Sequence, residues 1–185
     1  MLFQLALHSG MREGELLGVK WEDLDWKTRQ LQVKRQLQIM PGKGLVFAEP
    51  KTAAGRRTIV LSKFMVGKLR EHLEDQNQNR QLAREKWQEN GLIFPTTIGT
   101  PMAARNMYKD FRKLLIRAGL PPIRFHDLRH TAATLMLQQG IHPKIVQERL
   151  GHADISMTLN IYSHVLPSMR EEAAEKMTNS LLRLK

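Results

Sequence analysis

The chain has 185 residues, of which 29 are Lys or Arg and 18 are Asp or Glu, so its formal net charge is +11. With 42% hydrophobic and 25% charged residues it is long enough to bury one substantial core, which excludes a disordered basic tail. It has no Cys, which excludes disulfides, Cys-based zinc sites, iron–sulfur clusters and thiol nucleophiles. Without a long apolar run or a secretory leader, we expect a cytoplasmic protein that does not bind membranes.

The positive charge is concentrated in one part of the sequence. Residues 27–72 carry 11 basic and 2 acidic side chains, whereas residues 1–26 carry 2 basic and 5 acidic ones. A local excess of this kind is typical of proteins that bind a phosphate backbone. It favours nucleic acid over an anionic membrane, because the basic stretch is not one amphipathic helix. Solubility alone is the alternative explanation of the charge.

The first third of the chain predicts two short helices and a small sheet. An apolar helix over residues 2–8 is broken by Ser9-Gly10, and a second helix follows, so that Arg12 lies at a helix start. Three short antiparallel strands are expected, the second and third joined by a connection that places Lys51 at or near a hairpin tip. The strands lie within residues 30–39, 45–47 and 57–61.

The rest of the chain predicts helices. Gly119-Leu120-Pro121-Pro122 ends one of them firmly, and Gly140 and Gly151 end two others. The expected fold is one mainly α domain that carries a small three-stranded antiparallel β-sheet, an α+β class. The expected helices cover residues 63–88, 102–118, 126–139, 143–150 and 155–165, and the tail 168–184 is also helix-prone.

The most informative stretch is His126-Asp127-Leu128-Arg129-His130, whose i, i+3 and i+4 spacing brings two imidazoles and a guanidinium onto one helical face. A solvated helix start is the plain alternative. A zinc site is a second one, because H-E-x-x-H motifs use His at i and i+4. Asp127 replaces the catalytic Glu of that motif, however, and Arg129 adds positive charge. The face therefore suits an anion such as phosphate better than a cation.

Other candidates gain value only in combination. Leu150-Gly151-His152 places a His just past a helix stop, and Tyr162 is one of only two tyrosines. A phenol is a possible nucleophile where positive neighbours stabilise its ionised form. Glu15 is spaced to hold Arg12 through one helical turn, although a surface ion pair has the same spacing. Together these residues form a phosphoryl-transfer set with no metal-binding carboxylate cluster.

In this order, the elements resemble the catalytic domain of tyrosine recombinases, the phage and conjugative-transposon integrase family. The resemblance spans about Leu5 to Val165 and is closest between Leu150 and Val165. It rests on several motifs together, since none is specific alone. They are Ser9-Gly10-Met11-Arg12-Glu13-Gly14-Glu15-Leu16, Lys51-Thr52 before Gly55-Arg56-Arg57, His126-Asp127-Leu128-Arg129-His130, Leu150-Gly151-His152 and Tyr162.

The resemblance implies the role of each catalytic residue. Tyr162 would attack a DNA phosphodiester, giving a 3′-phosphotyrosyl link and a free 5′-hydroxyl, and the reverse reaction would rejoin strands without ATP, metal or cofactor. Arg12 and Arg129 would bind the nonbridging oxygens. Further implied roles are proton transfer by His126, a hydrogen bond from His152 to the phosphate, protonation of the leaving 5′-oxygen by Lys51, and support from Glu15 and His130.

The resemblance also sets expectations about DNA binding and assembly. We expect backbone contacts to double-stranded DNA from Lys43, Arg56, Arg57 and Arg105, and a tetrameric synapse of the full-length protein on DNA. Residues 1–166 are interpreted as the catalytic domain of a bacterial or phage-encoded protein, without the family's N-terminal core-binding domain. In residues 167–185, Ala173, Met177, Leu181 and Leu184 form an apolar stripe that we expect to dock on a neighbouring protomer, with core packing as the alternative.

Three other functions are consistent with parts of the sequence. The first is a non-catalytic DNA-binding fragment, which keeps the catalytic residues but does not assemble them into a working active site. The chain is a type IB topoisomerase-like strand transferase if it relaxes DNA without site preference. A metal-dependent hydrolase that uses His126 and His130 predicts loss of activity with a chelator.

Overall fold

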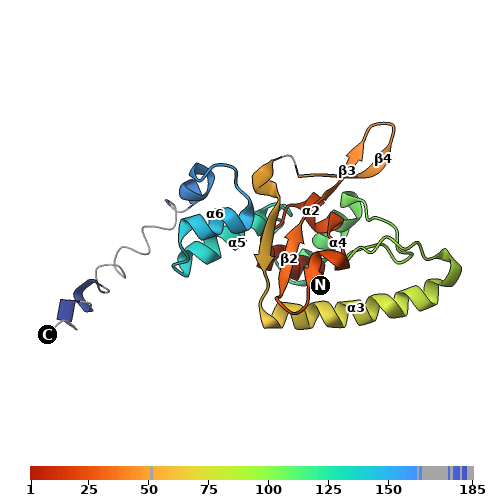
Figure 1. The fold of residues 1–185 in the computed structure, drawn as a ribbon, viewed down its shortest axis with the longest axis horizontal. Coiled ribbons are helices and arrows are strands. Elements are labelled where there is room, and N and C mark those ends of the chain that lie inside the picture. The colour runs from red at the N-terminus through yellow and green to blue at the C-terminus, as the bar shows by residue number, and fades with distance from the viewer. Residues whose placement is uncertain (51, 162, 164–174, 176, 180, 183–185) are drawn as a thin grey trace.

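A computed structural model describes residues 1–50, 52–161, 163, 175, 177–179 and 181–182. Its helices surround a small sheet near the middle of the molecule (Figure 1). The long helix α3 (Lys63–Ala83) runs along one side, and a β-hairpin projects from the opposite side. At one end lie α5 (Asp127–Gln138) and α6 (Pro143–Leu150). The predicted mainly helical fold with a small antiparallel sheet is confirmed.

The sheet differs in detail from the prediction. The run expected as one strand over residues 30–39 is two strands, β2 (Gln30–Val33) and β3 (Gln36–Met40). The three-stranded sheet has the order β1-β2-β5, in which β1 (Leu24–Asp25) and β5 (Arg57–Val60) both pair antiparallel with β2. Leu31 pairs with Ile59, and both are buried. After Val33 the chain leaves the three-stranded sheet and pairs with β4 instead, although Leu37 of β3 is buried in the same core as Leu31 of β2.

That hairpin corrects the expected position of the connection that contains Lys51. β3 pairs with β4 (Gly44–Ala48), so the hairpin turn lies at residues 41–43. β4 and β5 belong to different sheets, and the segment between them is therefore a crossing connection and not a hairpin tip. Its described part contains the 3-10 turn η2 (Ala53–Gly55). Lys51 itself lies outside the described residues.

The predicted helices are found close to their expected bounds. α1 (Leu2–Ser9) ends at Gly10, whose φ of 65° is the left-handed cap conformation that glycine adopts without a Cβ penalty. The helix expected over residues 63–88 ends earlier and continues as the 3-10 turn η3 (Arg84–Lys86). The remaining helices are α2 (Glu13–Gly18), α4 (Ala104–Arg117) and a helical stretch over residues 156–161.

Two hydrophobic clusters hold these elements together. The larger joins α1 and α2 to the sheet, α3 and α4, and includes Leu5, Leu16, Leu31 and Ile59. The smaller lies between α5 and α6 and consists of Ala133, Leu137, Val146 and Leu150, against which Ile161 packs. The second cluster places the stretch that leads to residue 162 beside α5 and α6.

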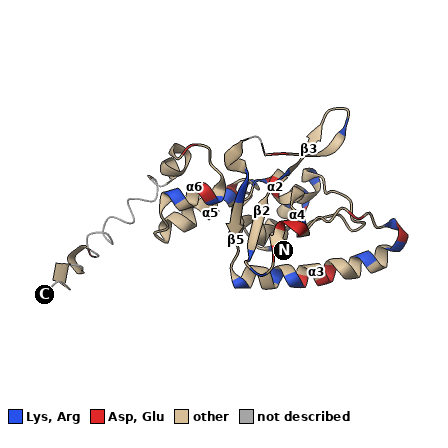
Figure 2. Cartoon of the chain, in the orientation of Figure 1, with Lys and Arg blue, Asp and Glu red and all other residues tan. Residues whose placement is uncertain are grey.

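The acidic N-terminal segment and the basic segment that follows it partly neutralise each other. Asp23 pairs with Arg35 at 2.5 Å and with Lys34 at 3.6 Å, and Glu15 pairs with Arg57 at 2.8 Å. On the ribbon, Lys and Arg occur on most elements (Figure 2). The positive charge is therefore less concentrated in space than along the sequence. In the part of the chain that the structure describes, no helix is long and apolar enough to cross a membrane.

Candidate active site

Arg12 lies at the N-cap of α2, as predicted. The chain reaches it through a tight turn at Gly10, where a side-chain Cβ would clash with Cδ2 of Leu150. Its guanidinium donates from Nη1 to Oε1 of Glu15 at 3.0 Å and from Nη2 to the carbonyl oxygen of Gly151 at 3.2 Å. The Arg12 side chain keeps 40% of its surface exposed. Both terminal nitrogens of the guanidinium are therefore held in place, while part of the side chain remains accessible to a ligand.

Glu15 is the buried anion of the site. Its side chain is 2% exposed, and its two oxygens accept hydrogen bonds from the backbone N–H of Arg12 and from the guanidinium groups of Arg12 and Arg57. Burial alone raises the pKa of Glu15, but hydrogen bonding and charge from Arg57, together with Arg12, outweigh it and leave the pKa below its ordinary value. Glu15 is therefore a buried, ionised carboxylate that holds Arg12, and its pairing with Arg12 is not a surface ion pair.

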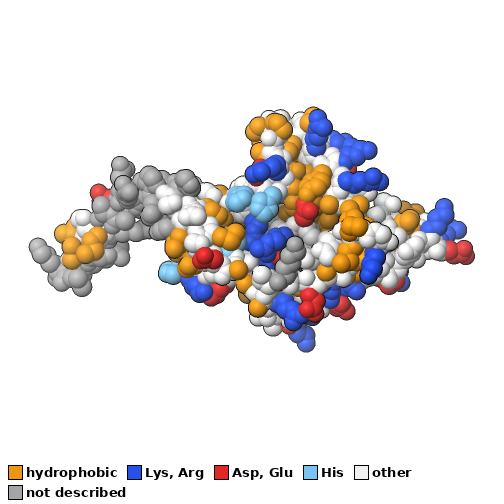
Figure 3. All heavy atoms as spheres, turned by 90° about the horizontal axis from the view of Figure 1, so that it is seen from above, with side chains coloured by type: hydrophobic (Ala, Val, Ile, Leu, Met, Phe, Trp, Pro, Cys, Tyr) orange, Lys and Arg blue, Asp and Glu red, His pale blue; other side chains and the backbone are white. Residues whose placement is uncertain are grey.

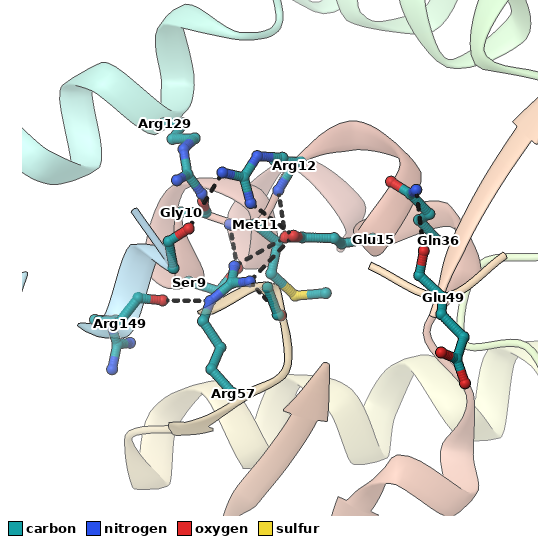
Figure 4. A network of polar contacts seen from close by, with 12 residues as sticks. Ser9, Gly10, Met11, Arg12, Glu15, Gln36, Glu49, Arg57, Arg129 and Arg149 are labelled. Atoms are coloured by element: carbon teal, nitrogen blue, oxygen red, sulfur yellow. Dashed lines mark hydrogen bonds and ion pairs between the residues drawn. The ribbon is translucent and has the colours of Figure 1, made fainter. Parts of the chain in front are cut away.

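Arg129 is the second arginine of the site and is 5% exposed. Nη1 donates to the carbonyl oxygen of Gly10 at 2.6 Å, and within the described residues Nη2 is buried without a hydrogen-bond partner. Burial, followed by the positive charges of Arg12 and Arg57, lowers the pKa of Arg129 to about 9. A buried guanidinium with an unused donor is costly unless an anion completes its shell. Figure 4 shows Arg12, Arg57 and Arg129 gathered around Glu15 and Gly10.

His126 and His130 lie on the same face, as the spacing predicts. Their rings meet edge to face with centroids 4.9 Å apart. His126, Arg12 and Arg129 all line a pocket of about 180 Å³. Burial lowers the pKa of His126, and the charges of His130 and Arg129 lower it further. At neutral pH a neutral His126 is therefore able to accept a proton. Among the described residues, no group of three or more His, Asp and Glu side chains is placed to hold a metal ion.

His152 follows the C-terminal end of α6 and is 6% exposed. Its backbone is held on both sides by Gln147, because the N–H of His152 donates to the Gln147 carbonyl at 3.1 Å and the Gln147 amide donates to the His152 carbonyl at 3.2 Å. Nδ1 lies 2.9 Å from the hydroxyl of Thr158, which is fully buried. Burial, with the charges of Arg129 and Arg12, lowers the pKa of His152 to about 4. The ring is neutral at pH 7.

The two remaining predicted catalytic residues, Lys51 and Tyr162, lie outside the described residues. The stretch that precedes Tyr162 in the sequence is described. Residues 156–161 are helical, and Ile161 packs against the cluster between α5 and α6. Thr158, on the same stretch, contacts His152.

The four predicted DNA contacts differ in accessibility. Lys43 in the β3–β4 turn, Arg105 on α4 and Arg56 before β5 are exposed. Arg56 pairs with Glu49 at 2.5 Å, and both side chains are largely exposed. Arg57, by contrast, has a 6% exposed side chain that is bound to Glu15. The Arg57 side chain points into the protein, whereas that of Arg56 faces solvent. On one face of the molecule, His side chains lie beside Lys and Arg side chains (Figure 3).

Sequence reasoning missed two supporting residues and the direction of a third. Thr158 holds His152, and Arg149 donates to the backbone carbonyls of Val60 and His8, tying α6 to β5 and α1. The sequence did contain a pattern that indicates the inward direction of the Arg57 side chain. In a strand, alternate residues share a face, and Arg57 alternates with Ile59 and Leu61, both of which are buried.

Comparisons with known proteins agree with this geometry. The family model described as "Phage integrase family" matches residues 1–169. The tyrosine recombinase XerC-like protein of Caldanaerobacter subterraneus subsp. tengcongensis is 38% identical over 96% of this chain and 48% of its own length. The ICEBs1 integrase of Bacillus subtilis is 27% identical over 97% of this chain and 48% of its own length. The chain thus spans about half the length of these relatives.

Solved structures give the same result. The Tn1549 transposon integrase in complex with circular intermediate DNA matches 96% of this chain and 58% of its own, with a TM-score of 0.77 and 28% identity. The XerH site-specific recombinase bound to palindromic difH substrate, in a post-cleavage complex, matches 94% of this chain and 44% of its own, with a TM-score of 0.65 and 29% identity. Because the family model covers nearly the whole chain and the fold agrees, the chain belongs to the phage integrase family of tyrosine recombinases.

Proposed function

We propose that the chain is the catalytic part of a site-specific DNA recombinase that cleaves and rejoins duplex DNA through a 3′-phosphotyrosyl intermediate. The observation that carries this proposal is the pair of guanidiniums of Arg12 and Arg129. Arg12 is anchored to Glu15 and to the Gly151 carbonyl, Arg129 is anchored to the Gly10 carbonyl, and within the described residues Arg129 keeps a buried donor without a partner. Such preorganised donors stabilise the charge that develops on a phosphate in the transition state.

The remaining groups have complementary tasks in this proposal. Tyr162 is the nucleophile, and a neutral His126 exchanges its proton. His152, neutral at pH 7, donates one ring N–H to the phosphate while its other nitrogen bonds Thr158. Lys51 protonates the departing 5′-oxygen. Storing the bond as a phosphotyrosine makes the step reversible without ATP or a metal, so a different 5′-hydroxyl is able to attack and exchange strands.

The test is a trapped covalent adduct. Selection of the duplexes that the protein binds from a DNA library, followed by their sequencing, maps the site without cleavage, and a nicked duplex that carries this site then serves as a suicide substrate. We expect the wild type to form an adduct that survives denaturant, and Tyr162→Phe to form none. A wild type without adduct on a mapped site contradicts the proposal and favours a non-catalytic DNA-binding fragment.

Two added measurements separate the other enzyme classes. Adduct formation is expected to continue with excess chelator, whereas a hydrolase that uses His126 and His130 with a metal would lose activity. Supercoiled DNA is expected to be cleaved only at the mapped site. Relaxation without site preference would instead support a type IB topoisomerase-like activity.

We further propose how this region is used in the whole protein. Residues 1–166 are the catalytic domain, which acts in the cytoplasm within a tetrameric synapse on DNA. In the tail, Met177 and Leu181 are exposed, while Ala173 and Leu184 lie outside the described residues. Exposure of the described stripe residues supports docking on a neighbouring protomer. Deleting residues 167–185 should weaken assembly on DNA and leave cleavage intact, and unchanged assembly would contradict this role.

A further inference from the structure

The Arg57 guanidinium is a buried polar group that joins three separate segments. Nη1 and Nη2 bind the two oxygens of Glu15 on α2 at 3.0 and 2.8 Å, and Nη1 also donates to the carbonyl oxygen of Gly55 at 3.1 Å. Nε donates to the carbonyl oxygen of Arg149 on α6 at 2.7 Å. Figure 4 shows the side chain reaching from β5 to both partners. This use of the planar fork is specific to arginine.

The first consequence concerns Arg12. Glu15 Oε1 is shared by Nη1 of Arg12 and Nη1 of Arg57, so the two arginines divide one carboxylate. If Arg57 were absent, Arg12 would be the remaining side-chain partner of a buried anion. A carboxylate that is only half compensated would draw Arg12 inward and repel an incoming phosphate. Arg57 therefore leaves the outer face of Arg12 available.

The second consequence concerns the end of α6. The last carbonyls of a helix have no partner within the helix and carry partial negative charge. Two of these groups, on Arg149 and Gly151, accept hydrogen bonds from Arg57 and Arg12 respectively. A Cβ on Gly151 would lie 3.0 Å from Cδ of Arg57 and 2.6 Å from the carbonyl oxygen of Ala54. Glycine at this position thus makes room for Arg57 immediately before His152.

We propose that Arg57 is a positioning residue for the phosphate site, which it organises by holding Glu15 and the α6 end and through them Arg12 and His152. This inference rests on the proposed recombinase function. It gives different roles to two adjacent arginines, Arg56 and Arg57, that were both expected to contact DNA. Arg56 faces solvent beside Glu49, where a DNA backbone is able to reach it, whereas Arg57 acts from inside the protein.

The test compares Arg57→Met with Arg35→Met, because Arg35, whose side chain is 20% exposed, also pairs with a buried carboxylate, Asp23. Methionine keeps the aliphatic stem and removes the charge in both. On the nicked duplex with the mapped site, we expect Arg57→Met to lower the single-turnover cleavage rate at saturating DNA on the order of 10²-fold, as small misplacements of catalytic groups do. Its DNA dissociation constant should change much less, and Arg35→Met should cleave at the wild-type rate even where it melts earlier.

A double variant shows whether Arg57 acts through Glu15. Glu15→Gln keeps an oxygen for Arg12 and removes the negative charge that Arg57 compensates. Adding it to Arg57→Met should therefore cost no further activity, or restore part of it. If the rate losses of Glu15→Gln and Arg57→Met multiply in the double variant, the inference is overturned. An Arg57→Met cleavage rate within about threefold of the wild-type rate would overturn it too, because changes that do not touch a functional group have effects of this size.

Inorganic phosphate supplies a second readout without DNA. A ligand of the folded state raises the melting temperature. At constant ionic strength, phosphate should protect the wild type and Arg35→Met against thermal unfolding, but protect Arg57→Met less. Equal protection of the wild type, Arg35→Met and Arg57→Met contradicts the positioning role of Arg57 but leaves the proposed function standing. A wild type that neither forms the adduct nor is protected by phosphate contradicts the proposed function, and this inference falls with it.

Discussion

Nη1 of Arg129 donates a 2.6 Å hydrogen bond to the carbonyl oxygen of Gly10, 119 positions earlier in the chain. The bond ties α5 to the turn that leads into Arg12, so Arg129 is anchored to the backbone that positions Arg12. The left-handed conformation of Gly10 turns its carbonyl toward α5, and Leu150 fills the space where a side chain would lie. The site is therefore built around a backbone turn and not around a single helix.

The first prediction follows from this anchor. In Arg129→Lys, one ammonium group replaces the fork and cannot bond Gly10 and reach a phosphate in the same geometry. We expect the single-turnover cleavage rate to fall on the order of 10²- to 10³-fold, as on loss of one transition-state donor. Arg117→Lys, on the exposed end of α4, is the matched control and should cleave at the wild-type rate. Equal rates for both variants would show that Arg129 does not bind the phosphate.

The second prediction concerns Thr158 and the tautomer of His152. Nδ1 lies 2.9 Å from the Thr158 hydroxyl, and we expect this hydroxyl to donate to Nδ1, which leaves the ring proton on Nε2 for the phosphate. Thr158→Val removes one hydrogen bond, which contributes about 0.5–1.5 kcal/mol, and should slow cleavage roughly tenfold. Thr158→Ser should recover most of the rate. Ring nitrogen chemical shifts of His152 report the tautomer directly, and an unchanged tautomer in Thr158→Val would count against this role.

The third prediction is a loss of stability in weak acid. The pKa of His152 is about 4 in the folded chain and about 6.5 when unfolded, so the unfolded state binds more protons between these values. The stabilisation is fully present above pH 6.5 and is lost as the pH falls toward 4. It amounts to about 3 kcal/mol at most. Burial also lowers the pKa of His8, His72 and His126, which act in the same direction.

Urea unfolding at pH 7 and pH 4.5 measures this effect. The wild type should lose free energy of unfolding between the two values, and His152→Gln should lose less, because its side chain does not titrate. The other three histidines, and carboxylates whose pKa is lowered in the fold, such as Glu15, contribute to the remaining slope. An identical pH dependence in both proteins would show that His152 is not buried as a neutral ring.

The fourth prediction concerns Lys51, whose role stays a prediction from the sequence because it lies outside the described residues. Lys51→Ala should slow cleavage of an ordinary phosphodiester, since the 5′-oxygen then leaves without a proton. A bridging 5′-sulfur leaves without protonation. Cleavage of this substrate should therefore be affected much less, and equal losses on both substrates would exclude Lys51 as the general acid.

The fifth prediction concerns Arg56, whose side chain is 58% exposed. If it contacts one phosphate, Arg56→Ala should weaken DNA binding similarly on all sequences and reduce the slope of log affinity against log salt by about 1. Binding isotherms over a range of salt concentrations measure the slope. A slope equal to that of the wild type would remove Arg56 from the interface.

Local patterns predicted much of this molecule. Glycine stops at Gly10, Gly140 and Gly151 bounded the helices, because such signals act over a few residues and need no tertiary partner. The spacing of His126, Arg129 and His130 placed them on one face for the same reason. The strand partners were not predictable in this way. Residues 30–39 were expected to form one strand, but Val33 pairs with Arg57 on the distant strand β5, whereas Gln36 pairs with Ala48 on the next strand, β4.

By itself, the sequence determined that the protein is a mainly helical domain with excess positive charge and which residues are suited to phosphate chemistry. The tertiary structure decided how those charges are used. Asp23 and Glu15 neutralise basic residues of the next segment, so part of the excess lies inside the fold and not on a DNA-facing surface. It also decided that Arg56 points outward and Arg57 inward. The physical reason is that charges separated along the chain interact only when folding brings them within a few ångströms and removes water between them.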